Sequence, residues 1–337
     1  MTEARFYRKL GDDKVRCLLC PHRCLISPGK RGRCGVRENR GGVLYSLVYQ
    51  KAISSHVDPI EKKPFFHFLP GSASFSVATI GCNLSCRFCQ NSDISQAGKE
   101  TTEIYGADLS PAEIICQAKQ SGCLSVSYTY TEPTVFFEYA FDTAVLAKQE
   151  GLANNFVTNG YIAAEPLKAI APYLDAANVD LKSFREEYYR KICGGSLKPV
   201  LDTLVLMKAQ KIWVEVTTLV LPGQNDSEAE LRDIAIFLRD KLGSETPWHV
   251  SRFFPRYQMD ASPPTLPETI DRARRIGLDV GLKFVYSGNL TGGSGENTFC
   301  PDCGQTLIRR FGFTLAGNKI QGGCCSFCGA KIAGVFN

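Results

Sequence analysis

Three cysteines lie close together in residues 81–89, where they can hold a metal centre. Cys82, Cys86 and Cys89 follow the pattern C-x3-C-x2-C, so one tight loop carries all three thiolates. Three cysteine ligands on a four-iron cluster leave one iron without a protein ligand, and an open position lets a metal centre bind and activate another molecule. We therefore predict a [4Fe-4S] cluster. The alternatives are a zinc site with a fourth ligand elsewhere and three buried free cysteines.

The C-terminal part carries two C-x2-C pairs separated by twenty-one residues, which is close to zinc-ribbon spacing. The four cysteines are Cys300, Cys303, Cys325 and Cys328. Four thiolates complete a tetrahedral zinc coordination, so such a site is structural. Cys324 could take the place of Cys325, and free or redox-active thiols are the alternative to zinc. Residues 306–320, between the pairs, are predicted to form a β-hairpin.

The N-terminal part contains a third group, with the pattern C-x2-C-x3-C-x9-C. Its members are Cys17, Cys20, Cys24 and Cys34. The spacing differs from the ferredoxin pattern C-x2-C-x2-C-x3-C. We interpret the group as a structural zinc site, with a second Fe–S cluster as the alternative and His22 as a further candidate ligand. Cys116, Cys123 and Cys193 stand alone, and a lone cysteine is usually a small buried apolar residue.

Composition and charge restrict the classes of protein that carry such sites. The chain has 337 residues, 15 cysteines and a net charge of +5. Secreted disulfide-rich proteins are much shorter, and we find neither an apolar signal segment nor a run of about eighteen apolar residues that could span a membrane. No long Lys/Arg run indicates nucleic acid or membrane binding. We expect a cytoplasmic protein with metal-binding cysteines, no nucleic acid partner and no membrane partner.

The central part alternates strand-like and helix-like segments, which is typical of a parallel sheet with crossover helices. The predicted strands are 75–80, 124–130, 155–158, 177–181, 213–221 and 249–254. Ser110 and Glu113 predict a capping box at the start of one helix, and further helices are predicted over about 133–150 and after Asp226-Ser227. The pattern predicts an α/β fold with an open or closed parallel barrel, whose chemistry lies at the C-terminal ends of the strands.

The cysteine groups and the Gly-rich segment 287–295 divide the chain into three predicted parts. Residues 1–70 form a small Cys-rich head, residues 71–290 the barrel, and residues 291–337 a zinc-ribbon-like tail. A polar stretch from His56 to His67 joins head and barrel. Some of His56, Asp58, Lys62, Lys63 and His67 line the substrate entrance, or all of them are solvated linker residues.

The loop of Cys82, Cys86 and Cys89 resembles that of the radical S-adenosylmethionine (SAM) superfamily. The surrounding sequence is similar to glycyl-radical-enzyme activases such as the pyruvate formate-lyase activating enzyme. More narrowly, residues 56–71, 82–96 and 127–133 resemble radical SAM enzymes of the AmmeMemoRadiSam system. The resemblance covers nearly the whole chain. It implies a partial (β/α)6 TIM-like barrel with a [4Fe-4S] cluster and SAM as cofactors.

The resemblance also implies which residues contact SAM. Glu132 lies in Tyr130-Thr-Glu-Pro133, where the activases carry Gly-Gly-Glu-Pro, so Glu132 is expected to recognise the SAM amino group, although the glycines are absent. The expected cofactor-binding residues are Phe88, Tyr130, Glu132, Thr158, Asn159, Asp180, Lys182 and His249. Structural alternatives remain: a helix N-terminal carboxylate for Glu132, a turn at Asn159, a surface ion pair for Asp180 with Lys182, and a satisfied buried histidine for His249.

The implied reaction begins with electron transfer from the reduced cluster to SAM, after which a 5′-deoxyadenosyl radical abstracts hydrogen from a substrate. A small-molecule substrate is the first hypothesis, and an activase that installs a glycyl radical on a partner protein is the alternative. The implied partners are a flavodoxin- or ferredoxin-type electron donor and Memo-like and AMMECR-like pathway proteins. A non-enzymatic zinc-ribbon nucleic-acid-binding protein is a distant alternative, because it leaves the cysteine loop unexplained.

Overall fold

A computed structural model of the chain describes residues 1–101, 103–290 and 293–336. Its centre is an eight-stranded sheet with the order β16-β15-β14-β13-β12-β11-β9-β8. The strands are β8 (Ser54–Pro59), β9 (Ala73–Ala78), β11 (Ser125–Tyr128), β12 (Ala153–Thr158), β13 (Ala176–Asp180), β14 (Trp213–Val220), β15 (Trp248–Arg252) and β16 (Val285–Gly288). Strands β9 and β11 to β16 are parallel, and β8 runs antiparallel to β9.

The structure contains all six predicted strands, as β9 and β11 to β15, and two strands that the pattern did not predict. Strand β16 has four residues and precedes a Gly-rich segment, and β8 is an edge strand with the polar sequence SSHVDP, so neither shows a clear apolar period. Within the described residues β8 and β16 form the two edges of the sheet. The α/β fold with a parallel sheet is confirmed, with seven parallel strands where six were predicted.

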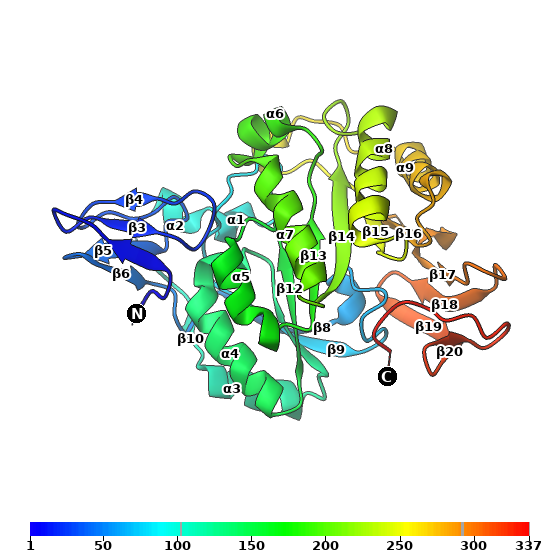
Figure 1. Cartoon of the computed structure of the whole chain (residues 1–337), viewed down its shortest axis with the longest axis horizontal. Helices are drawn as coiled ribbons and strands as arrows, with labels where there is room; N and C mark the ends of the chain where they lie inside the picture. Colours follow the sequence, from blue (N-terminus) through cyan, green and yellow to red (C-terminus); the bar gives the residue numbers. More distant parts are fainter. Residues whose placement is uncertain (102, 291–292, 337) are drawn as a thin grey trace.

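Helices connect successive parallel strands. They are α3 (Pro111–Gln120), α4 (Phe137–Gln149), α5 (Ala164–Ile170), α7 (Leu197–Ala209), α8 (Glu228–Phe237) and α9 (Pro267–Val280). Short helices α1 (Ser92–Ser95) and α2 (Ala97–Glu100) follow β9, and α6 (Glu186–Tyr188) follows β13. The capping box at Ser110 and Glu113 is present, and Ser227 caps α8. Figure 1 shows α4, α5, α7 and α8 side by side over one face of the sheet.

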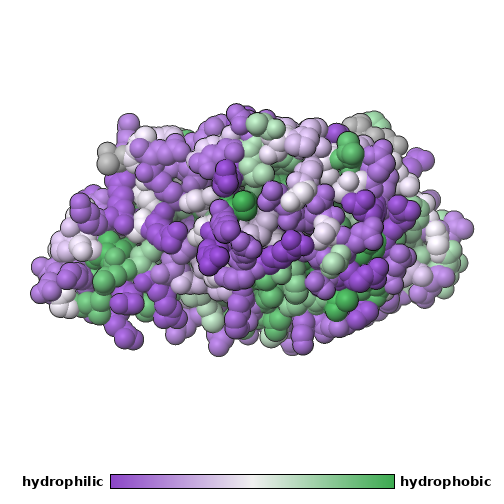
Figure 2. Space-filling view, turned by 90° about the horizontal axis from the view of Figure 1, so that it is seen from above, coloured by the Kyte–Doolittle hydropathy of each residue, from purple (hydrophilic) through white to green (hydrophobic). Residues whose placement is uncertain are grey.

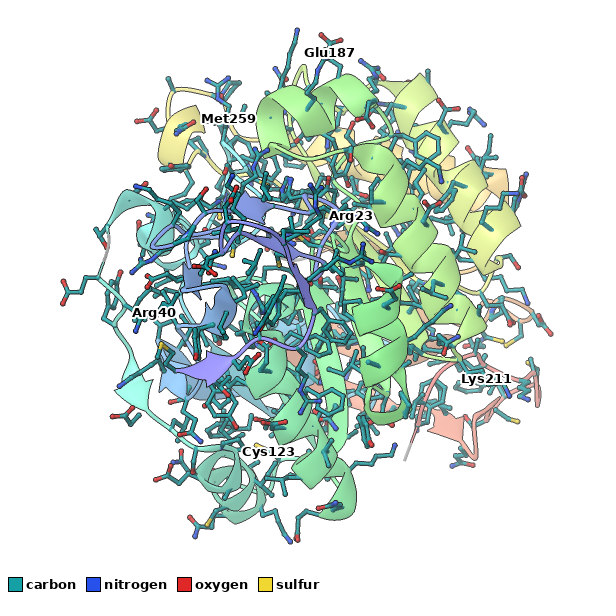
Figure 3. All side chains as sticks on the ribbon, turned by 60° about the vertical axis from the view of Figure 1, so that its left-hand side comes forward. Arg23, Arg40, Cys123, Glu187, Lys211 and Met259 are labelled. Carbon is teal, nitrogen blue, oxygen red and sulfur yellow. The ribbon has the colours of Figure 1, made fainter. Side chains whose placement is uncertain are left out.

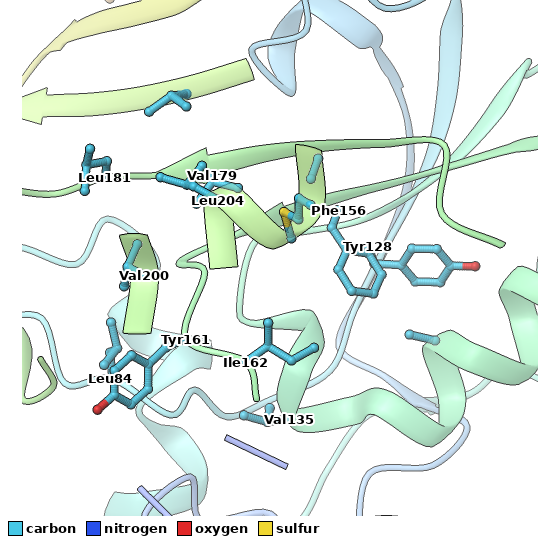
Figure 4. Close-up of a cluster of buried hydrophobic side chains, with 14 of the residues drawn as sticks. Leu84, Tyr128, Val135, Phe156, Tyr161, Ile162, Val179, Leu181, Val200 and Leu204 are labelled. Carbon is cyan, nitrogen blue, oxygen red and sulfur yellow. The ribbon is translucent and has the colours of Figure 1, made fainter. Parts of the chain in front are cut away.

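The core between sheet and helices anchors the loop after β9. Leu84, between two of its cysteines, is fully buried and lies beside Tyr161, below Val200 of α7 (Figure 4). The backbone approaches closely there, since a Cβ on Gly195 would lie 2.6 Å from Leu84 Cδ2. The apolar side chain of Leu84 therefore fixes the loop while its neighbours stay free for chemistry.

The head lies at the left of the sheet in Figure 1 and is built from two small antiparallel sheets. Their strands are β1 (Thr2–Glu3), β2 (Tyr7–Lys9), β3 (Val15–Cys17), β4 (Leu25–Ile26), β5 (Arg37–Arg40) and β6 (Val43–Ser46), and β7 (Lys51–Ala52) pairs with β10 (Ala107–Asp108). Arg37 donates to both carboxylate oxygens of Glu138 on α4, at 2.8 and 2.9 Å. Because both side chains are buried, this ion pair fixes the head to the barrel.

The tail lies at the opposite side of the sheet from the head (Figure 1). Its strands are β17 (Thr298–Phe299), β18 (Thr306–Phe311), β19 (Thr314–Asn318), β20 (Ile320–Gln321) and β21 (Cys324–Cys325). Strands β18 and β19 form the predicted hairpin. The predicted boundary between barrel and tail touches Thr291 and Gly292, and the tail's last residue is Asn337; all three lie outside the described residues.

The tail packs against the second half of residues 60–69. Arg310 of β18 is 4% exposed and donates to the carbonyl of Phe66 at 2.8 Å. The backbone N–H of Val335 donates to the His67 carbonyl at 2.7 Å. Except for the exposed Lys62, residues 60–69 therefore form a buried plug and not a solvated linker. Within the described residues, no helix combines the length and apolar character needed to cross a bilayer.

Candidate active site

The loop after β9 and the C-terminal ends of the strands enclose a cleft of about 330 Å³. Its lining includes the three loop cysteines and seven of the predicted cofactor-binding residues. These are Cys82, Cys86, Cys89, Phe88, Tyr130, Glu132, Thr158, Asn159, Asp180 and Lys182. Hydrophilic residues dominate the face shown from above in Figure 2, the side on which α6 and the loop after β15 lie in Figure 1. The structure thus gathers residues from four separate segments at the C-terminal ends of the parallel strands.

Hydrogen-bond donors point at the loop sulfurs. The backbone N–H of Leu84 donates to Cys82 Sγ at 3.4 Å, and Asn159 Nδ2 reaches the same sulfur at 3.6 Å. Ser95 Oγ lies 3.2 Å from Cys89 Sγ. Burial raises the pKa of the Cys82 thiol, so a thiolate at this position needs these donors and a metal centre to stabilise its charge.

The spacing of the loop sulfurs fits a cluster better than a single ion. Within the described residues, the four tail cysteines are the one group of three or more His, Cys, Asp or Glu whose ligand atoms all lie within 4.8 Å of one another. Cys82, Cys86 and Cys89 are therefore farther apart than ligands of one ion. A four-iron cluster requires wider spacing, because each sulfur binds a different iron.

Glu132 connects the ends of β11 and β12. Its Oε1 accepts hydrogen bonds from the backbone N–H and hydroxyl of Thr134 and from the Thr158 hydroxyl, at 2.6–3.0 Å. Its Oε2 accepts one, from Asn159 N at 2.8 Å. A carboxylate oxygen has about two lone-pair sites, so Oε2 retains room for one further donor. Burial raises the pKa of Glu132. The residue is both the helix N-terminal carboxylate of the structural alternative and a wall of the cleft.

Asn159 joins β12 to the cysteine loop. Besides its contact with Cys82 Sγ, its Nδ2 donates to Asn83 Oδ1 at 2.9 Å. Its Oδ1 accepts from Tyr161 N at 2.8 Å, which is the local turn expected of an Asn-Gly pair. Every polar atom of the side chain is therefore engaged with protein. Asn159 contacts a cysteine ligand of the predicted cluster.

Asp180 and Lys182 form an ion pair of 2.7 Å at the end of β13. The Lys182 side chain is 12% exposed, so this is not the surface pair of the structural alternative. Its ammonium lies 5.7 Å from the centre of the Phe88 ring. Burial would lower the pKa of Lys182, but the charges of Asp180 and the nearby thiols raise it well above its ordinary value.

Tyr130, Asp58, Lys62 and Lys63 form one connected group at the cleft. Tyr130 has a φ of +64°, a strained value for a non-glycine residue, and its hydroxyl donates to Asp58. Lys62 and Lys63 each donate to Asp58 at 2.8 Å. Burial lowers the pKa of Lys63 to about 8. The lysines and Tyr130 line the cleft, which matches the reading of this stretch as a substrate entrance.

His249 is not brought into the cleft, so the structure does not support its predicted contact with SAM. Its side chain is 3% exposed, and Nε2 hydrogen-bonds Glu215 Oε2 at 2.7 Å. Glu215 also accepts from the backbone N–H groups of Phe66 and His67. His249 therefore packs beside the buried plug, to which it is linked through Glu215 and through the Phe66 ring.

Cys193 is a neighbour of the site that its isolated position in the sequence did not indicate. It ends a π-helical turn (Tyr189–Cys193), and its carbonyl accepts from Ser85 N at 2.7 Å. The turn brings its thiol into contact with Cys86. Lys99 was also missed, and it holds the loop by donating to the Leu84 carbonyl at 2.6 Å. Neither residue carries a spacing signal, because tertiary packing alone places it there.

The tail cysteines converge on one point. Cys300 Sγ lies 3.6 Å from Cys328 Sγ, and Cys303 Sγ lies 3.8 Å from Cys325 Sγ. Cys324 is not part of this group. The head cysteines line a separate small cavity together with His22. The tail group can hold one metal ion without rearrangement.

Comparison with known proteins places the site in a family. Residues 76–235 match the family model of the Radical SAM superfamily. The uncharacterized protein MJ0808 of Methanocaldococcus jannaschii is 48% identical over 98% of this chain and 99% of its own length. Both the matched segment and the cleft-lining residues of β9 to β14 lie in the central part of the chain.

More distant relatives match about half of the chain. The probable GTP 3′,8-cyclase of Methanosarcina mazei is 30% identical over 48% of this chain and 49% of its own. The isethionate sulfite-lyase activating enzyme of Nitratidesulfovibrio vulgaris is 24% identical over 46% and 53%. A radical SAM methyltransferase structure from Sphaerobacter thermophilus superposes with a TM-score of 0.51 and 18% identity, covering 71% of each chain, which shows a shared fold.

Proposed function

Since this chain belongs to the radical SAM superfamily, we propose that it cleaves SAM reductively at a [4Fe-4S] cluster held by Cys82, Cys86 and Cys89. When bound, the cluster supplies an electron that breaks the S–C5′ bond of SAM, and the 5′-deoxyadenosyl radical then abstracts hydrogen from a substrate. The observation that carries the proposal is the convergence of the three cysteines and seven further predicted residues on one cleft.

The chain's own residues hold and shield the reacting groups. Asn159 and Leu84 donate to Cys82 Sγ, and such donors stabilise sulfur charge and raise the reduction potential of a cluster. The free position on Glu132 Oε2 suits a donor such as the SAM ammonium. The cleft volume of about 330 Å³ falls within the range of small-ligand sites, about 300–1,000 Å³, so the cleft can hold a small ligand.

We propose a small molecule as the substrate. One connected group narrows the entrance of the cleft, and it consists of Asp58, Lys62, Lys63 and Tyr130. A connected ionic group of this kind suits a polar metabolite. Relatives named GTP 3′,8-cyclases provide a precedent for a small substrate. The alternative is an activase that installs a glycyl radical on a protein, which the relatives named activating enzymes support.

The proposal includes the setting of the reaction. A flavodoxin- or ferredoxin-type protein supplies single electrons. The resemblance of residues 56–71 to the AmmeMemoRadiSam system favours Memo-like and AMMECR-like proteins as pathway partners. We propose a cytoplasmic location, because reduced cysteines that bind metals are typical of that compartment.

We propose zinc as the metal of the tail. Four sulfurs bonded to zinc at about 2.3 Å in tetrahedral geometry lie about 3.8 Å from one another. The distances of 3.6 and 3.8 Å between the tail sulfurs agree with that spacing. A closed site of four thiolates leaves no open position, so its role is to stabilise the tail against the plug.

The test of SAM binding is spectroscopic. The EPR spectrum of the anaerobically reconstituted and reduced protein should change when SAM is added, because SAM binds the open iron. Asn159→Asp alters a residue at the cleft. His249→Gln alters a residue outside the cleft and is its matched control. A spectrum that SAM leaves unchanged would contradict the proposal.

A second experiment separates the two substrate classes. Cells grown in heavy water provide a deuterated extract, which is divided into small molecules and proteins. We expect the enzyme to form deuterium-labelled 5′-deoxyadenosine only when it reacts with the small-molecule fraction. Deuterium transfer from the protein fraction alone would establish the activase instead.

A further inference from the structure

The four cysteines of the head surround an enclosed cavity. Its lining includes Cys17, Cys20, Cys24 and Cys34, together with His22, Arg33 and Arg37. The cavity measures about 20 Å³ on the same measure as the cleft. About 10–15 Å³ suffices for one water molecule, so the cavity leaves room for a bound group between the four sulfurs.

The head and the tail differ in sulfur spacing within one structure. The four tail sulfurs lie within 4.8 Å of one another, whereas within the described residues no three head cysteines form such a group. A single zinc ion requires the compact arrangement of the tail. A cubane requires wider spacing of its cysteine sulfurs around a cavity. The head cysteines have this wider spacing, and so do Cys82, Cys86 and Cys89.

The protein around the cavity is arranged for bound thiolates. Backbone groups of Leu19, His22 and Val36 hydrogen-bond the sulfur two residues earlier, at Cys17, Cys20 and Cys34. Leu84 makes the same contact with Cys82 in the cleft. Repetition of this contact around three of the four head sulfurs indicates sulfur atoms that carry negative charge.

Arg37 provides an independent sign of a missing group. Its side chain is 1% exposed and lines the cavity, and its two terminal nitrogens are bound by Glu138. Its Nε is buried and has no hydrogen-bond partner among the described residues. Buried donors are rarely left unsatisfied. A cluster carried by four thiolates is anionic, and its sulfur atoms would satisfy this donor.

The cavity shares a wall with the active-site loop. Asn83 lines the cavity, and its carbonyl accepts from His22 Nε2 at 2.8 Å. The same residue directly follows Cys82 and binds Asn159 through its side chain. The head cavity therefore adjoins the catalytic loop, with Asn83 between the cavity and Cys82.

We propose that Cys17, Cys20, Cys24 and Cys34 bind a second Fe–S cluster. The role of this second cluster rests on the function proposed above, and we assign it as an electron relay. It takes one electron from a reduced flavodoxin- or ferredoxin-type donor, passes that electron to the catalytic cluster and so returns to its oxidised state. The zinc reading of the head is thereby replaced.

The test is a metal count on the full-length chain after anaerobic reconstitution. We expect about eight iron and about one zinc in the parent protein, since a cubane holds four iron and the tail holds zinc. The triple variant Cys82→Ala, Cys86→Ala and Cys89→Ala leaves the head intact, so it should retain about four iron. The variant Cys17→Ser with Cys34→Ser should also retain about four. Cys123→Ala is the control, because Cys123 is buried yet lies far below the head loop of Arg23 in Figure 3.

The outcomes separate this proposal from the proposed function. The tail can hold at most one iron ion in place of zinc, so a count of about four iron in the triple variant reports the head and does not depend on SAM chemistry or on the folding of the head variant. About four iron and two zinc in the parent, with an iron-free triple variant, would overturn the second cluster. The relay predicts that the head variant loses reduction of the catalytic cluster by flavodoxin but keeps reduction by dithionite. Unchanged reduction by flavodoxin would overturn the relay.

Discussion

Replacement of His249 by Ala should lower stability and leave SAM binding intact. The variant loses the hydrogen bond of 2.7 Å to the buried carboxylate of Glu215, which at a charged partner contributes about 1.5–3 kcal/mol. It also loses ring contacts with Phe66 and Tyr286, whose centroids lie 4.8 and 5.2 Å away and which contribute about 0.5–1.5 kcal/mol each. Together these contributions predict a loss of about 2.5–6 kcal/mol.

Anaerobic urea unfolding gives the free-energy change, and equilibrium dialysis gives the dissociation constant of SAM. We expect the dissociation constant of His249→Ala to stay within about twofold of the parent value, because distant sites act independently. His56→Ala is the matched control, since His56 is exposed, and its stability should change by less than about 0.5 kcal/mol. The reasoning is refuted if His249→Ala weakens SAM binding strongly while unfolding remains unchanged.

Three further predictions follow from contacts in the structure. Asn159→Ala removes a donor to Cys82 Sγ, so a potentiometric titration should show a lower reduction potential of the catalytic cluster; an unchanged potential contradicts this role. Burial lowers the pKa of His67 from 6.5 to about 4, so the unfolded chain binds the proton at a higher pH than the folded chain does. The free energy of unfolding therefore falls by about 3 kcal/mol as the pH decreases from about 6.5 to 4. Unfolding curves of His67→Gln should show a weaker dependence over that range than those of the parent or of His56→Gln. Cys303→Ser should release about one zinc, retain all iron and lower the melting temperature, and a zinc content equal to that of the parent speaks against the tail site.

Local sequence signals predicted the strands and the side of the barrel that carries chemistry. The predicted strands are largely buried, and their apolar and β-branched residues identify them even where serine or asparagine occupies part of one face. The polar residues that follow β11, β12 and β13 lie at one edge because parallel strands end there together. Glu132, Asn159 and Lys182 were predicted from the resemblance to the activases, and this rule explains why they line one cleft.

Contacts between distant segments were beyond prediction. His249 meets Glu215 through a separation of 34 residues, and Glu215 meets Phe66 through 149. Such a network depends on how the plug enters the barrel, which no local period encodes. Cys193 likewise reaches Cys86 only through a π-helical turn. The short strand β16 and the polar edge strand β8 lack the periodic signal that identified the others.

Formation of 5′-deoxyadenosine tests the central claim most directly. The protein is reconstituted anaerobically with iron and sulfide, reduced with dithionite and mixed with SAM, with Cys86→Ala and Cys123→Ala treated in parallel. The account predicts 5′-deoxyadenosine from the parent and from Cys123→Ala, and none from Cys86→Ala. Equal amounts from the parent and Cys86→Ala, or zinc without iron in the loop of Cys82, Cys86 and Cys89, would contradict it.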